Sequence, residues 1–183
     1  MKKPLLIAAV MVVAAPALAQ TFLPNPTDDE TRAPRPARAR GIPVALAWEA
    51  ALVANAACRQ AGFRSTTVVL DSEGVPILMA SDDGATAMSQ RAAAGKAMIS
   101  VKTKGPSADG NKADPAIMVS LGRGRGGGFP LMAGTEVVGA LAVGGTPTAK
   151  QDEACAQAGI AKIQDRVAAS AVVPPPPVPE KRP

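Results

Sequence analysis

The spacing of apolar residues predicts a helix, a β-hairpin and a second helix in the first half of the folded region. From Pro43 to Ala61 apolar residues recur at helical spacing, and Gly62 supplies a stop. The face expected to be buried comprises Val44, Trp48, Ala51, Leu52, Asn55 and Cys58. Residues 65–70 and 75–80 are branched and apolar, and the turn-forming sequence 71–74 between them predicts a hairpin. Residues 86–101, rich in Ala and Met, predict the second helix.

The second half predicts a polar loop over 102–114 and three further short strands, 116–121, 129–132 and 136–143. Gly134-Thr135 joins the last two strands into a hairpin. Thr148 and Gln151 have the spacing of a capping box, which opens a final helix with the apolar stripe Ile160, Ile163 and Val167. Hairpins dominate over strand–helix–strand repeats. We therefore predict an α+β fold with a five-stranded, mainly antiparallel sheet flanked by helices.

The N-terminus has the three regions of a secretory signal. Two lysines precede an apolar run over residues 5–15, and Ala17-Leu18-Ala19 follows as a cleavage site. Pro16 and the polar sequence after Gln20 leave this run shorter than the roughly 20 apolar residues of a membrane span. Residues 1–19 are thus predicted to be a signal peptide of an exported protein, periplasmic or secreted, with no stable membrane insertion after cleavage.

The Pro- and Arg-rich lead, residues 20–40, has almost no large apolar residues and is predicted to be disordered. The Pro-rich tail, residues 171–183, is predicted to be disordered with polyproline II character. Between them, residues 41–170 are predicted to form a single folded domain.

Composition excludes several classes of function. The chain of 183 residues has no His and no Tyr, and 2% of it is aromatic. Histidine-ligated zinc or haem, Ser-His-Asp catalysis and Cys-His catalysis are therefore excluded. The net charge of +5 comes from the ends, since residues 41–172 hold 12 basic and 11 acidic side chains. A nearly neutral domain has no basic stripe for nucleic acid.

Export would place Cys58 and Cys155 in an oxidising compartment, where a disulfide is permitted. Each cysteine lies among apolar helical neighbours, however, and a bridge requires Cα atoms within about 7 Å. We expect two buried free thiols.

Three groups of residues have the chemistry of a site. Gly122–Gly128 satisfies a phosphate-loop pattern, but a strand rather than a helix is predicted to follow, so a flexible connection is favoured. Arg123 and Arg125 within it can pair with ligand carboxylates. Asp82-Asp83 favours a turn that precedes a helix over acid–base work. Lys96 can reach a pocket, but a helical lysine is usually solvated. No nucleophile and base stand at a recognisable spacing.

Residues 136–145 (EVVGALAVGG) and 151–159 (QDEACAQAG) resemble the C-terminal signature of a small haem-binding family. This family includes the glycolate-utilisation G protein and secreted haem-binding sensors. Residues 68–74 are similar to the family's hairpin, 82–85 to its D-G-A turn and 91–97 to its second helix. The resemblance implies a two-layer α+β module of the PAS or profilin kind, assembly into dimers or larger homo-oligomers, and haem as ligand, with haem degradation in the family's name.

The resemblance also directs attention to the second helix. Family members commonly have a threonine there as a pocket or iron contact, and this chain has Ile99 at that position. Ser100 is one residue further, about 100° around the helix. Met88 and Met98 are soft alternatives, although such residues are more often core. The iron ligand is left open.

The predicted haem site combines apolar walls from Val68, Met98 and Leu141 with propionate contacts from Arg123 or Arg125. Lys96 and Ser100 are the remaining candidates. Without a strong iron ligand, the expected dissociation constant is about 1 μM or weaker. We predict an exported, non-catalytic haem- or small-ligand-binding module. The alternatives are an interaction protein that keeps the fold without a ligand, and an enzyme acting on haem.

Overall fold

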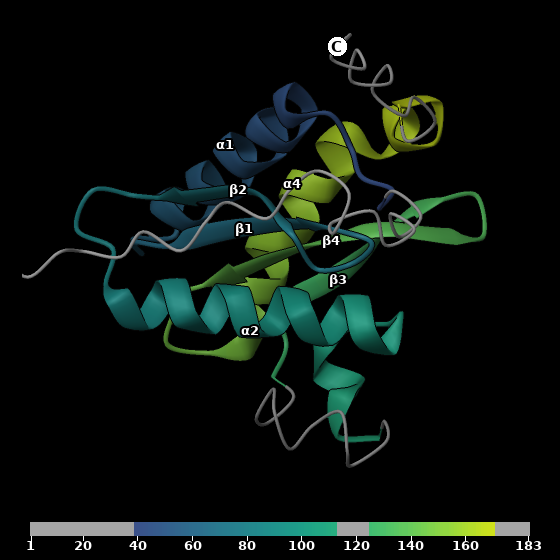
Figure 1. Ribbon diagram of the computed structural model, residues 1–183. Helices are drawn as coiled ribbons and strands as arrows, with labels where there is room; N and C mark the ends of the chain where they lie inside the picture. The colour runs from purple at the N-terminus through teal and green to yellow at the C-terminus, as the bar shows by residue number, and fades with distance from the viewer. Residues whose placement is uncertain (1–38, 113–124, 171–183) are drawn as a thin grey trace, which may run out of the picture. The chain divides into compact units, whose positions relative to one another are not determined.

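The computed structural model describes residues 39–112 and 125–170 (Figure 1). Its elements are α1 (Val44–Gln60), β1 (Thr66–Asp71), β2 (Pro76–Ser81), α2 (Ala87–Thr103), the 3₁₀ helix η1 (Ser107–Lys112), β3 (Gly128–Ala133), β4 (Glu136–Gly144) and α4 (Ala149–Ser170). The predicted alternation of helices and hairpins is confirmed, and η1 lies where a polar loop was predicted. The predicted signal peptide, most of the predicted lead and the predicted tail lie outside the described residues.

The sheet is antiparallel throughout, in the order β2-β1-β4-β3. Both predicted hairpins are present, and positive φ angles at Gly74 (90°) and Gly134 (64°) serve their turns. The described residues form four strands rather than the predicted five, because the expected strand over 116–121 lies outside them. After β2 the chain passes through α2 to β3, and the following strand β4 pairs with β1. Strand β1 therefore lies between β2 and β4 in the centre of the sheet.

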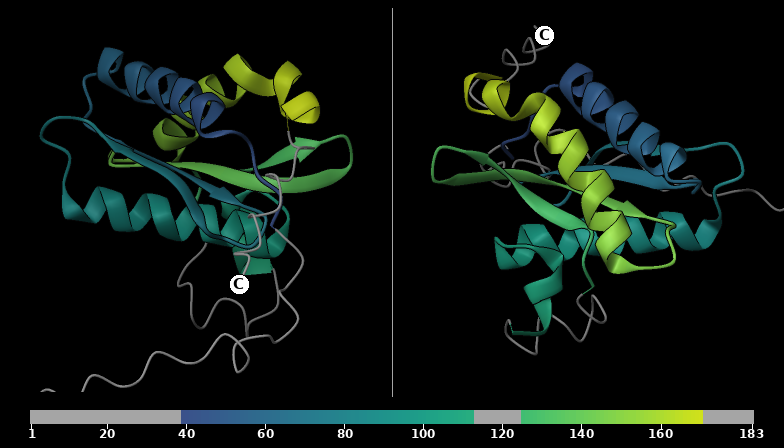
Figure 2. Two further views of the ribbon diagram at one scale, coloured as in Figure 1. Left: turned by 45° about the horizontal axis from the view of Figure 1, so that its top comes forward. Right: turned by 180° about the vertical axis from the view of Figure 1, so that it is seen from behind.

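Helices cover both faces of the sheet, so the domain has three layers and the two-layer expectation is wrong. Helices α1 and α4 lie on one face and α2 on the other (Figures 1 and 2). The alternation of side chains along β1 explains this: Val69 belongs to the core under α1 and α4, whereas Val68 and Leu70 belong to the core under α2. No helix in the described part of the chain is long and apolar enough to cross a membrane.

Helix α1 buries mainly alanines, together with Leu46, and exposes three of its large apolar residues. The prediction is right for Ala51, Asn55 and Cys58 and wrong for Val44, Trp48 and Leu52, which are 60%, 49% and 58% exposed. The cause is close packing on α4: a Cβ on Gly159 would lie 2.5 Å from the Ala50 carbonyl oxygen, so only small residues fit between the helices.

Cys58 and Cys155 form a disulfide, with Cα atoms 5.5 Å apart, so the expectation of free thiols is wrong. The end of α1 lies beside the beginning of α4, whereas Glu49 near the start of α1 pairs with Arg166 near the end of α4 at 2.8 Å. The two helices are therefore antiparallel, which brings together cysteines that are 97 residues apart in the sequence.

Local signals for the ends of the elements are confirmed. The Thr148 amide donates to Gln151 Oε1 at 3.2 Å, and the Gln151 amide donates to Thr148 Oγ1 at 3.4 Å, which completes the predicted capping box. Arg40, the last residue of the predicted lead, is attached to the fold: its amide donates to Ser72 Oγ, its carbonyl accepts from the Ser72 amide, and its guanidinium pairs with Glu136.

Candidate functional site: an apolar groove at the edge of the sheet

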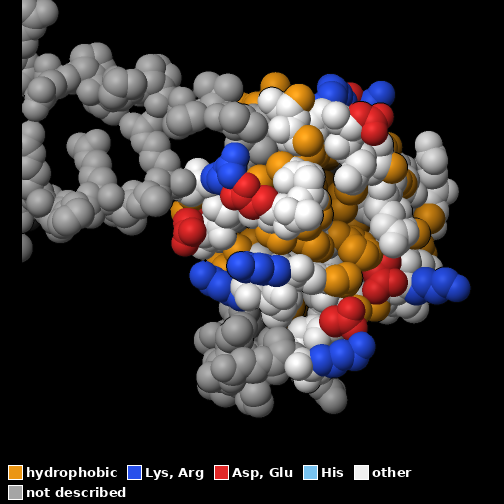
Figure 3. Space-filling model, turned by 90° about the vertical axis from the view of Figure 1, so that its right-hand side faces the viewer, with side chains coloured by type: hydrophobic (Ala, Val, Ile, Leu, Met, Phe, Trp, Pro, Cys, Tyr) orange, Lys and Arg blue, Asp and Glu red, His pale blue; other side chains and the backbone are white. Residues whose placement is uncertain are grey.

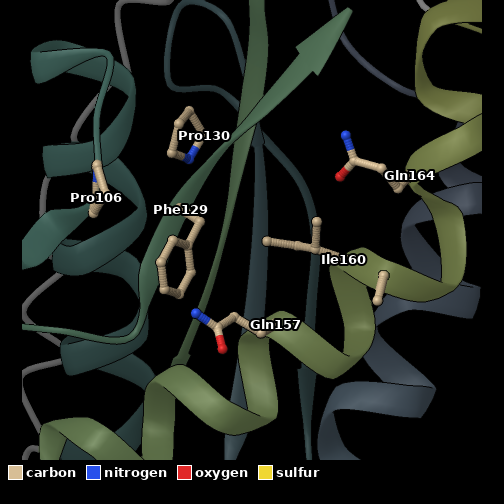
Figure 4. A pocket seen from close by; sticks show the side chains of 7 residues that line it. Pro106, Phe129, Pro130, Gln157, Ile160 and Gln164 are labelled. Atoms are coloured by element: carbon tan, nitrogen blue, oxygen red, sulfur yellow. The ribbon is translucent and has the colours of Figure 1, made fainter.

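A groove of about 560 Å³ lies where strand β3 meets helix α4 and the segment before η1 (Figure 4). Its lining residues are Pro106, Phe129, Pro130, Gln157, Ile160, Ala161 and Gln164. The four residues from α4 are spaced i, i+3, i+4 and i+7, so they share one face of the helix. A proline within β3 is compatible with its place at the edge of the described sheet, where an amide donor is not required.

The lining is mainly apolar and carries no titratable side chain. Ile160 extends toward β3 and Phe129, and the amides of Gln157 and Gln164 border this apolar centre (Figure 4). On the face shown in Figure 3, hydrophobic side chains likewise gather in the middle, with charged side chains around them. A groove of this size, with an apolar centre and a few polar groups, is suited to a flat apolar ligand.

Arg125 is the predicted site residue that the structure brings closest to the groove. Ser107, which follows the lining residue Pro106, donates its hydroxyl to the Arg125 carbonyl at 2.5 Å and accepts from the Gly128 amide at 2.9 Å. Gly128 precedes the lining residue Phe129. Arg125 itself is exposed. Arg123 lies outside the described residues.

Lys96 is buried in an ion pair, so the expectation of a solvated lysine is wrong. Its Nζ pairs with Asp152 at the start of α4 and donates to the Val143 carbonyl at 3.1 Å. The second carboxylate oxygen of Asp152 accepts from the Thr146 amide at 3.1 Å and from the Thr146 hydroxyl at 2.8 Å. The pair thus joins α2, β4 and α4, and it does not line the groove.

Gly127 lies directly over this ion pair. Its φ is 118°, and a Cβ there would lie 2.7 Å from Asp152 Cβ, 2.8 Å from the Val143 oxygen and 3.0 Å from Lys96 Nζ. Residues 126–128 are therefore a closely packed segment rather than the flexible connection that the sequence predicted. They carry the chain from Arg125 into β3 and so fix the position of Phe129 and Pro130.

Ser100 is also beneath this segment. It is fully buried, a Cβ on Gly128 would lie 3.0 Å from its Oγ, and that Oγ has no hydrogen-bond partner. Met98 is half-buried at the other end of the sheet, where a Cβ on Gly74 would lie 2.7 Å from its Sδ. Neither residue lines the groove.

The predicted apolar wall of Val68, Met98 and Leu141 does not form. Leu141 pairs with Val69 across β1 and β4, so it shares the face under α1 and α4. Val68 lies on the opposite face, with Met98 packed beside its cluster. The sheet itself therefore separates Leu141 from the other two residues.

Asp82 has the structural role that the sequence favoured. Its carboxylate accepts from the Ser65 amide at 3.1 Å and pairs with Arg59, and Gly84 completes the turn with a φ of 81°. The described residues contain no group of three or more His, Cys, Asp or Glu that could hold a metal ion.

The sequence analysis proposed none of the groove residues as site residues. Ile160 was named there only as part of the apolar stripe of the final helix. One signal was available: Gln157, Ile160, Ala161 and Gln164 mark a helical face that is only partly apolar. The contributions of β3 and Pro106 depend on how distant segments pack.

These features define a class of small α+β domain, a four-stranded antiparallel sheet with one helix on one face, two on the other and a ligand-sized groove at its edge. Residues 42–161 match the model of a protein family whose description is "Haem degrading protein HbpS-like". The chain belongs to this HbpS-like family. No curated protein matches it.

Solved structures agree with this assignment. HbpS is 27% identical with a TM-score of 0.62, and the match covers 71% of this chain and 95% of HbpS. A double mutant of Streptomyces reticuli HbpS is 25% identical with a TM-score of 0.61, covering 84% of this chain and 97% of the mutant. A PduOC–haem complex, at 20% identity and a TM-score of 0.60, covers 67% of this chain and 95% of that one and shares the fold.

Proposed function

We propose that this protein is an exported, non-catalytic haem-binding module that holds the porphyrin in the groove between β3 and α4. The observation that carries the proposal is the apolar groove of about 560 Å³ at the edge of the sheet. Membership of the HbpS-like family and the likeness to HbpS support haem as the ligand.

The groove is better suited to binding the porphyrin ring than to coordinating the iron. Its volume lies within the range of roughly 300–1,000 Å³ that is usual for such ligands, and Phe129 and Ile160 offer apolar surface for a flat ring. Arg125 is exposed and its backbone is held next to the lining residue Pro106, so we propose that its guanidinium pairs with a propionate. Bound haem would supply a redox-active iron, while the chain's residues bind the ring, orient its plane and exclude water from its apolar surface.

A binding role is favoured over catalysis because of what lines the groove. None of the seven described lining side chains can act as a general acid or base at neutral pH. The buried amine of Lys96 and carboxylate of Asp152 are occupied by each other and by backbone and threonine groups.

The disulfide supports export to the periplasm or beyond the cell. Bridges such as Cys58–Cys155 persist in oxidising compartments and are rare in the cytosol. The signal-like sequence of residues 1–19 independently favours the same localisation.

We further propose that the protein forms a homodimer through α1 and β2, which is an outer strand of the described sheet. Val44, Trp48 and Leu52 are exposed at helical spacing, and β2 has no charged residue to discourage strand pairing. A two-fold axis along this edge would bury both features in one interface.

The test of the dimer is the molar mass measured by light scattering. The wild type should be a dimer, and Leu52→Glu should dissociate it into monomers. Ala161→Glu, at an exposed residue of α4, should leave the dimer intact. A wild type that is monomeric at all concentrations would contradict the proposal.

The test of haem binding uses two matched alanines on α4. Ala161 and Ala154 are both exposed, but only Ala161 lines the groove. Because Ala161→Glu places a charge against the porphyrin, haemin titration followed by the Soret band should show binding at least about tenfold weaker. Ala154→Glu should bind like the wild type, and Arg125→Ala should weaken binding by about threefold to tenfold.

Two results would contradict the proposal. If Ala161→Glu binds haemin as tightly as Ala154→Glu, the groove is not the site. If the wild-type Soret band is unchanged at haemin concentrations well above about 1 μM, haem is not the ligand.

A further inference from the structure

Side chains that bind haem iron strongly are missing from the groove. The chain contains no His and no Tyr, and both of its cysteines are consumed by the disulfide. The seven methionines are the remaining soft donors in the sequence, and none of those within residues 39–112 and 125–170 lines the groove. Among the described lining residues, Gln157 and Gln164 provide the side-chain oxygen atoms. Neutral amide oxygens are hard donors, unlike the imidazole, thiolate, thioether or phenolate that usually hold haem iron.

The features that remain for recognition belong to the ring and its substituents. Phe129, Pro130 and Ile160 offer apolar surface to a flat macrocycle. The backbone of Arg125 is held by Ser107, next to the lining residue Pro106, and the guanidinium of this exposed residue matches a carboxylate. A metal-free porphyrin that carries two propionates presents the same apolar faces and the same carboxylates as haem. Within the groove that the described residues form, nothing distinguishes the two ligands.

We infer that the groove recognises dicarboxylic porphyrins by their plane and their propionates, and that it binds them with nearly the same affinity whatever metal they hold. This inference rests on the proposed function, since it concerns the same groove. It extends the ligand class from haem to metal-free and zinc-substituted porphyrins.

The experiment compares three probes on the full mature chain: haemin, protoporphyrin IX and zinc protoporphyrin IX. Haemin binding is followed by the Soret band, and the other two are followed by the anisotropy of their own fluorescence. The three dissociation constants should agree within about threefold. Ala161→Glu should weaken all three by a common factor, and Ala154→Glu should weaken none, which distinguishes the groove from adsorption elsewhere on the surface.

The possible failures are distinguishable. If haemin binds more than about tenfold more tightly than protoporphyrin IX, a protein group binds the iron: the inference is then wrong and the proposed function stands. If the two iron-free probes bind equally well to wild type and to Ala161→Glu while haemin does not, the inference is again wrong. If haemin does not bind, the proposed function fails and the inference fails with it.

Discussion

Removing either member of the Lys96–Asp152 ion pair should destabilise the domain strongly, whereas removing both should cost much less than the sum. The two side chains are 8% and 5% exposed, so solvent cannot replace a lost partner. Breaking a buried pair from one side typically costs about 3–5 kcal/mol, because the other charge is left uncompensated.

The structure indicates which single change is worse. In Lys96→Met, the Asp152 carboxylate keeps two hydrogen bonds from Thr146 and the favourable N-terminal end of α4, so we expect a loss of about 3 kcal/mol. In Asp152→Asn, the Lys96 ammonium keeps the Val143 carbonyl and loses its counter-charge, so we expect about 5 kcal/mol. In the double variant neither charge is buried, and the total loss should be no more than that of the worse single variant.

The assay is equilibrium unfolding in guanidinium chloride of the oxidised protein, followed by circular dichroism. All four proteins should have the same m-value, so that the midpoints report stability alone. The interaction energy from the double-mutant cycle should be about 3 kcal/mol or more, because the single losses add up to about 8 kcal/mol and the double variant should lose no more than about 5 kcal/mol. Single variants that lie within about 1 kcal/mol of wild type, or losses that simply add, would refute the reasoning that this pair is buried and mutually dependent.

Three further results are expected. Replacing Cys58 and Cys155 by Ser should lower the free energy of unfolding by about 4–5 kcal/mol, since the bridge closes a loop of 97 residues; labelling of the denatured wild type by a thiol reagent without reductant would show that the bridge is missing. Gly127→Ala should cost more than about 2 kcal/mol by guanidinium unfolding, because backbone strain adds to the overlaps over Lys96. Gly62→Ala is the control, because Gly62 also has a positive φ of 85° but an added Cβ there would meet no atom within 4 Å, and it should cost about 1 kcal/mol. Equal losses for the two variants would contradict the packing argument. Mass spectrometry of the exported protein should find Gln20 at the N-terminus, and retention of Met1 would contradict the signal prediction.

The elements could be predicted because their signals are local. The capping box of Thr148 and Gln151 and the turn around Gly74 act within a few residues, and the structure confirms both. The number of layers was misjudged although a signal was present. Two adjacent valines in β1 face opposite cores, and an unbroken apolar run such as Val68–Leu70 is typical of a strand covered on both faces. The run does not indicate which helices cover each face, because that depends on packing between distant segments.

The site was harder to predict because its parts meet only after folding. Lys96 and Asp152 are 56 residues apart, and nothing near either residue in the sequence indicates the partner. The exposed face of α1 was misassigned for a related reason: apolar periodicity favours burial of Trp48, whereas the alanines pack on Gly159 of a helix about a hundred residues later. The role of Arg125 as a propionate contact stays a prediction, made from the chemistry of its guanidinium alone.

The packing of the first helix on the last one determines when this domain can fold. As the chain is made, α1 and the β1–β2 hairpin are complete early, but their partners α4 and β4 lie at the far end of the domain. Non-local contacts of this kind slow folding because much of the chain must be ordered before they form. A nascent chain that ends before Glu136 lacks β4, the strand that completes the centre of the sheet, and one that ends before Cys155 cannot close the bridge. The native state therefore becomes accessible only when synthesis of the domain is almost complete.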